Sequence, residues 1–180
     1  MSSATSPRAV LRVAWPIGVS MISFTLKGVI DMLMVGRLGP MALAGVGFAS
    51  VAAWIAITFP WGMLRGQRPL ISQYDGAGDS KATFSFGAHG FYLAVLWGLL
   101  LFALSWVGQG FLEDIAATTA LAPESGAIAG EYLKWRLIFA LPTILAFAVA
   151  EYQRSLGRTR IPMGVDLITH PLNVLFNWVF

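Results

Sequence analysis

The sequence predicts an all-α, polytopic membrane helix bundle. Hydrophobic residues make up 57% of the 180 residues and charged residues only 12%, with a mean hydropathy of +0.70. Soluble domains carry about 25% charged residues, so this chain has half the usual share. The apolar residues also gather in long runs, and a membrane-spanning helix needs about 20 of them. Composition and pattern together predict about five transmembrane helices.

The predicted spans cover residues 10–35, 41–64, 90–112, 130–152 and 161–180. The second and third contain no charged residue, and the first contains an acid and a base near its end. The fourth has only fourteen residues without charge, but aromatic and basic side chains at its start suit the membrane interface, where long basic side chains snorkel. The fifth has no polar exit, so we expect the chain to be a fragment.

The connections between the spans are polar. Residues 65–81 are predicted to form a loop that ends in a turn and a helix N-cap at 75–80, because Gly, Asp and Ser dominate there. Residues 113–124 are expected to form an acidic loop, and residues 153–160 a short basic one. Pro16 and Pro142 lie inside predicted spans and are expected to bend them.

The basic residues predict the orientation of the chain. Lysine and arginine in short loops favour the cytoplasmic side. Eight of them fall on the side of the N-terminus, and three fall on the other side (Arg37, Lys134 and Arg136). We therefore expect a multi-pass protein of the cell (inner) membrane with a cytoplasmic N-terminus. The net charge of +3 is explained by this placement, so no nucleic-acid partner is predicted.

Several function classes lack their residues. The chain has no cysteine, which removes disulfides and thiolate metal sites. Gly76-Ala77-Gly78 does not continue into a phosphate-binding glycine pattern. Asp166 and His170 are spaced like an acid–base dyad, but no nucleophile accompanies them, so packing or proton traffic is favoured. The sequence therefore predicts neither an enzyme nor a cofactor.

Lys27 and Asp31 stand four residues apart within the first apolar run. Each charge in hydrocarbon costs roughly 2.5–3.5 kcal/mol on insertion scales, so such residues are functional candidates. A mutual ion pair with a purely structural or counter-ion role is the alternative.

Three predicted helices place polar side chains in the outer half of the membrane. Asp31 lies about one turn before the outward end of the first span, and Tyr132 lies at the outward start of the fourth. At 1.5 Å per residue, Asn173 and Asn177 lie about 17 and 23 Å into the fifth. Oxygen ligands of this kind suit Na⁺ at Asp31, Asn173 and Asn177, or a proton held on Asp31. Taken singly, the asparagines could simply join helices, and Tyr132 could belong to the aromatic belt.

The fifth span carries a polar stripe on one helix face. Asp166, His170, Asn173 and Asn177 follow spacings of four, three and four. Pro171 lies within the stripe and frees the carbonyl of Leu167. A polar face in a membrane helix must meet protein or water.

Together these residues resemble a known family, the multidrug and toxic compound extrusion (MATE) transporters. The similar motifs lie at 29–39, 42–47, 69–73, 76–79 and 153–160, followed by the two asparagines of the fifth span. The resemblance implies a twelve-helix antiporter of two six-helix lobes, of which residues 1–180 are most of the N-terminal lobe. The C-terminal lobe would then be a missing partner.

The resemblance also implies roles for individual residues. Asp31 would couple transport to a cation or proton, with Tyr132, Asn173 and Asn177 near the same cavity, and Pro16 would let the first helix bend. Two positions depart from the family pattern: some members have an aspartate where Asn177 stands, and Lys27 is not expected.

The predicted function is cation- or proton-coupled efflux of lipophilic, often cationic drugs across the lipid bilayer. One alternative is a flippase for lipid-linked sugars of the same superfamily, which would need a more basic cavity. The other is a membrane scaffold subunit without transport, in which Asp31 would be purely structural.

Overall fold

The computed structural model describes residues 7–107, 114, 118 and 122–179. This part of the chain is helical and contains no strand, which confirms the predicted fold class. The helices of the described residues are α1 (Pro7–Gly36), α2 (Pro40–Gly66), α3 (Arg68–Gly76), α4 (Ser80–Val107), α6 (Pro123–Ile138), α7 (Ala140–Ser155) and α8 (Arg160–Val179).

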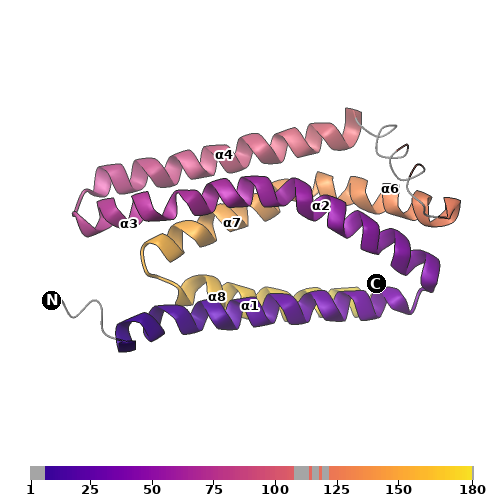
Figure 1. Ribbon diagram of the computed structural model, residues 1–180, viewed down its shortest axis with the longest axis horizontal. Coiled ribbons are helices and arrows are strands. Elements are labelled where there is room, and N and C mark those ends of the chain that lie inside the picture. The colour runs from indigo at the N-terminus through magenta and orange to yellow at the C-terminus, as the bar shows by residue number, and fades with distance from the viewer. Residues whose placement is uncertain (1–6, 108–113, 115–117, 119–121, 180) are drawn as a thin grey trace.

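The helices form two groups (Figure 1). The first and last helices, α1 and α8, lie side by side along most of their length. The bundle made of α2, α3, α4, α6 and α7 forms the other group, in which α4 packs on α7 and α2 packs on α6. Corner contacts of α1 with α2, and of α7 with α8, join the two groups.

Small residues let the helices of the bundle approach closely. On α2, Gly45, Ala49 and Ala53 follow one another at intervals of four and are buried. A Cβ atom on Gly45 would lie 2.6 Å from the backbone oxygen of Ser125 on α6. Small residues serve this purpose at membrane helix interfaces, where packing rather than the hydrophobic effect drives association.

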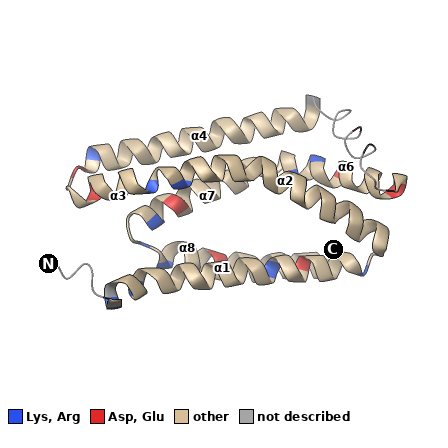
Figure 2. Cartoon of the chain, viewed as in Figure 1, with Lys and Arg blue, Asp and Glu red and all other residues tan. Residues whose placement is uncertain are grey.

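Most large apolar side chains point outward. Val10, Leu11, Ile22 and Leu33 on α1 are all more than half exposed. Most charged residues lie near the helix ends, with long uncharged stretches between them, but one basic and one acidic residue lie inside α1 (Figure 2). In water such a surface would be an aggregation liability, whereas lipid covers it without cost.

Three helical stretches of the described residues are long and apolar enough to cross a membrane: Val10–Gly36, Pro40–Gly76 and Ser80–Trp106. The pair of α6 and α7, bent by 50°, makes a fourth if it is one span. The bend follows from Pro142, which has no N–H to donate to the carbonyl of Ile138 and so breaks the helix at Phe139. The fifth expected span, α8, is a helix of 20 residues but is not among these stretches.

The segment expected to be a loop at 65–81 is largely helical. The α2 helix runs to Gly66, and α3 follows at once with Pro69 in its first turn, where proline is tolerated. The turn and cap are confirmed: Gly78 has a φ of +76°, and the Asp79 carboxylate accepts a hydrogen bond from the Ala82 N–H at 3.0 Å. Consequently α4 begins at residue 80, ten residues before the expected span. The expected acidic loop lies mostly outside the described residues.

Candidate functional site

Two charged side chains of α1 form an ion pair within the mainly apolar stretch that follows Arg12. Lys27 and Asp31 lie on the same face because they are four residues apart, and the Lys27 Nζ atom donates to Asp31 Oδ2 at 2.7 Å. Their side chains keep only 25% and 29% of their exposure. The pairing that the sequence left open is therefore present.

The α8 helix brings two carboxamides to the same carboxylate. Asn177 Nδ2 donates to Asp31 Oδ1 at 2.9 Å and to Asn173 Oδ1 at 3.4 Å. We call Lys27, Asp31, Asn173 and Asn177 the Asp31 cluster. Asp31 and the two asparagines, predicted from separate helices to share a depth, are thus in contact.

The rest of the polar stripe on α8 also finds partners. One turn or two from the cluster, His170 Nδ1 lies 2.8 Å from the Ser23 hydroxyl of α1. Farther toward the start of α8, Asp166 lies 3.8 Å from Arg154 of α7. The polar face of α8 therefore meets protein, as a polar face within a membrane helix must.

Tyr132 is the candidate that the structure does not bring to the cluster. It lies on α6 and packs against the apolar core of the bundle. In the described part of the chain, no Cα atom of α6 comes within 8 Å of a Cα atom of α1 or α8. Depth along the membrane placed Tyr132 level with Asp31, but depth does not fix the side of the bundle that a helix occupies.

In this arrangement nitrogen donors face the oxygens of Asp31 and Asn173. A carboxylate can only accept hydrogen bonds, so the Asn177 amide must turn its nitrogen, not its oxygen, toward Asp31. Both Asp31 oxygens and the Asn173 oxygen already receive N–H donors. Among the described residues, no group of three or more His, Cys, Asp or Glu side chains could hold a metal ion.

Pro16 and Pro171 lie inside α1 and α8, the two helices that carry the cluster. Each removes one backbone hydrogen bond from its helix. Pro16 is also fully buried. Both helices nevertheless continue through their proline.

A shallow groove of about 400 Å³ opens between α1 and α8 beside the cluster. Its lining is apolar apart from one arginine: Ile30, Met34, Arg37, Pro171, Val174, Leu175 and Trp178. A lipophilic molecule matches such a surface.

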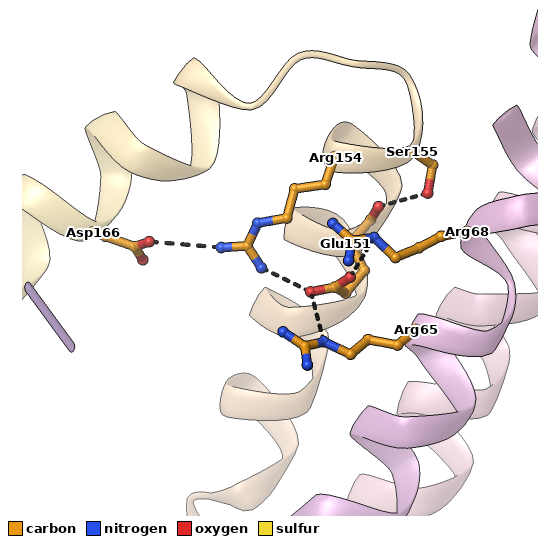
Figure 3. A network of polar contacts seen from close by, with 6 residues as sticks. All are labelled: Arg65, Arg68, Glu151, Arg154, Ser155 and Asp166. Carbon is orange, nitrogen blue, oxygen red and sulfur yellow. Dashed lines mark hydrogen bonds and ion pairs between the residues drawn. The ribbon is translucent and has the colours of Figure 1, made fainter. Parts of the chain in front are cut away.

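A second polar centre, which the sequence did not predict, surrounds Glu151 of α7 (Figure 3). The Glu151 side chain is 2% exposed and accepts a hydrogen bond from Arg154 Nη1 at 2.7 Å. Arg68 Nε lies 3.0 Å from the other carboxylate oxygen, as an ion pair without hydrogen-bond alignment, and Arg65 Nε lies 3.8 Å away. We call Arg65, Arg68, Glu151, Arg154 and Asp166 the Glu151 cluster.

The Glu151 cluster links four helices at one end of the molecule. Its residues come from α2, α3, α7 and α8, and the contact between Arg154 and Asp166 connects the bundle to the pair of α1 and α8. The Arg65 guanidinium also lies 3.9 Å from the centre of the Trp61 ring. The only sign of this cluster in the sequence is a single acidic residue, Glu151, at the end of an apolar run. The arginines around it predict the orientation of the chain, and their sequence positions do not indicate that they meet.

Comparisons with known proteins agree on one family. The family model described as MatE matches residues 16–179. A probable multidrug resistance protein NorM of Pseudomonas putida is 32% identical over 178 residues, which is 98% of this chain and 37% of that protein. A NorM of Halalkalibacterium halodurans is 30% identical over 170 residues, 94% of this chain and 36% of that protein.

Two solved structures share the fold. One, described as the outward-facing conformation of a multidrug resistance MATE family transporter, has a TM-score of 0.84 at 21% identity. The other, a MOP superfamily transporter from Pyrococcus furiosus, has a TM-score of 0.83 at 22% identity. Each match covers 95% of this chain and 37% of the other protein. The chain thus spans little more than a third of the length of the proteins that it matches.

Proposed function

The chain belongs to the MatE family of multi-pass membrane transporters, and from that premise we propose that it is part of an antiporter that exports lipophilic, often cationic compounds. The coupling group would be the Asp31 carboxylate. The observation that carries this proposal is the hydrogen bond between Asp31 and Asn177, which ties the charge state of α1 to its packing on α8.

Protonation of Asp31 would change both of its contacts in the cluster, with Lys27 and with Asn177. A neutral carboxyl group no longer attracts the Lys27 ammonium, and its new O–H competes with the Asn177 N–H for acceptors. The link between α1 and α8 would loosen, and Pro16 offers a point at which α1 can bend once that link is weaker. Coupling of proton binding to transport requires that α1 and α8 adopt two arrangements with different affinities for the proton.

The groove beside the cluster supports a lipophilic substrate. Its wall is shared by α1 and α8, so a change in their packing would alter its shape. Occupation of the groove and protonation of Asp31 would then influence each other through the same helix pair. Tyr132, remote from this pair in the structure, would act on transport only from the bundle side.

We further propose that the protein resides in the cell (inner) membrane with its N-terminus in the cytoplasm. The Glu151 cluster, the start of α4 and the turn between α7 and α8 gather lysine and arginine at one end of the molecule. Their excess over the basic residues at the other end supports that orientation.

The test replaces Asp31 by Asn in the full-length protein and measures drug efflux and resistance in a drug-sensitive host. We expect export to fall to the level of the empty vector, because an amide carries no negative charge and cannot take up the coupling proton or cation. Asp75→Asn, on the exposed surface of α3, is the matched control and should leave export unchanged. Normal export by Asp31→Asn at equal membrane abundance would reject coupling through Asp31 and favour a structural role.

A further inference from the structure

We infer that the Lys27 side chain is a tethered cation that occupies the Asp31 site and thereby decides which cations the site accepts. This inference rests on the proposed role of Asp31 in coupling. It concerns a residue that the resemblance to the transporter family does not explain.

The geometry of the cluster is that of a site already filled. Lys27 Nζ lies 2.7 Å from Asp31 Oδ2, the distance of a charge-assisted hydrogen bond. The other oxygen, Oδ1, receives the Asn177 amide at 2.9 Å, and the same amide reaches Asn173. Both oxygens of Asp31, and the side-chain oxygen of Asn173, therefore already receive one nitrogen donor each.

Lys27 and Asp31 form no other ion pair in the described part of the chain. On α8, His170 lies near enough to interact electrostatically with both, but its ring is hydrogen-bonded to Ser23, and Asp166 is paired with Arg154. The arginines of the Glu151 cluster face Glu151 and Asp166 at the corner between α7 and α8, whereas the Asp31 cluster lies toward the other end of α8. One ammonium thus balances one carboxylate, and a metal ion that entered would add an uncompensated positive charge.

Tethering gives Lys27 an advantage over an ion from solution. A group attached four residues away competes at a high effective concentration, whereas free Na⁺ must also shed water. The lysine ammonium sits on a flexible stem, and a quarter of the side chain remains exposed, so it can leave the carboxylate when Asp31 is protonated. The site can therefore respond to protons while it excludes Na⁺.

The experiment measures binding, not transport. The full-length protein in nanodiscs is titrated with radiolabelled Na⁺, with choline as the inert cation. Wild-type protein should show no saturable binding that depends on Asp31. Lys27→Met should gain saturable, Asp31-dependent binding where the wild type has none, because a like charge next to the site is removed. Lys27→Met combined with Asp31→Asn should lose it again, and Lys81→Met, an exposed lysine of α4, should resemble wild type.

Two results would overturn the inference. One is Asp31-dependent Na⁺ binding by the wild type as tight as that of Lys27→Met. The other is a folded Lys27→Met variant, with a normal size-exclusion profile, that binds no Na⁺. Lys27→Gln provides the same test if the methionine variant aggregates. For the wild type alone, an Asp31-dependent rise in unfolding temperature with Na⁺ over choline would also contradict it. Failure of coupling appears separately, as unchanged efflux by Asp31→Asn.

Discussion

Replacement of Glu151 by Gln removes the only acid from the centre of the Glu151 cluster while it keeps the shape of the side chain. The carboxylate is almost completely buried and receives cations from three sides. In the variant, the three guanidinium groups would face one another with only an amide between them. We expect a marked loss of stability without a change of fold.

The magnitude can be estimated contact by contact. The 2.7 Å hydrogen bond from Arg154, which is 14% exposed, belongs to the class worth about 1.5–3 kcal/mol, and a neutral acceptor would retain about 1 kcal/mol of it. Arg68 and Arg65 are about a third exposed, so solvent screening limits each ion pair to about 0–1 kcal/mol. These losses add to about 0.5–4 kcal/mol, with a midpoint near 2 kcal/mol.

The assay is thermal unfolding of the full-length protein in detergent, followed by the loss of the monodisperse size-exclusion peak. Glu131→Gln on α6 is the matched control, because Glu131 is exposed, and such surface changes stay within about 0.5 kcal/mol. If Glu151→Gln unfolds at the temperature of the wild type and of Glu131→Gln, the Glu151 cluster does not stabilise the fold as argued.

Three further predictions address packing, the site and a helix cap. Gly45→Val should lower stability by about 1–3 kcal/mol, since its side chain would overlap the backbone of α6; Gly47→Val, with open space around it, is the control in the same unfolding assay. Asn177→Leu should reduce efflux to the level of Asp31→Asn at unchanged abundance, and full activity would show that α8 does not sense Asp31. Asp79→Ala should cost about 1 kcal/mol by removing the cap of α4, measured as a lower unfolding temperature with efflux retained.

Hydropathy was sufficient to predict the helical fold. In a membrane, a long apolar segment can satisfy all of its backbone hydrogen bonds internally only as a helix. Hydropathy was not sufficient for α3, because a stretch of nine residues that mixes polar and apolar side chains is too short and too polar to be recognised as a span. Pro142 was the only feature of the sequence that predicted the bend at Phe139. Its 50° angle depends on how α6 and α7 pack against α2 and α4.

The candidate site shows the same division. Asp31, Asn173 and Asn177 could be placed together because the two helices that carry them were expected to cross the bilayer in opposite directions, and spacing along the sequence sets the face of a helix. Tyr132 was predicted at the same depth, but it lies on α6, which packs on α2, α4 and α7. The periodicity of a sequence shows which face of a helix is apolar, but not which other helix covers that face. The partners of Glu151 come from segments far apart in sequence, so only the tertiary structure brings them together.

The sequence distance between Asp31 and its carboxamide partner has a consequence for biosynthesis. Asn177 is made 146 residues after Asp31, which at about 5–20 residues per second is a delay of roughly 7–30 s. During that interval the newly inserted first helix would expose a lone acid to lipid. Lys27 is synthesised four residues before Asp31 and lies one helical turn away, so its ammonium can neutralise the carboxylate at once. A ribosome-bound nascent chain that carries Lys27→Met should therefore insert its first helix less efficiently than the native one, before any of α8 has emerged.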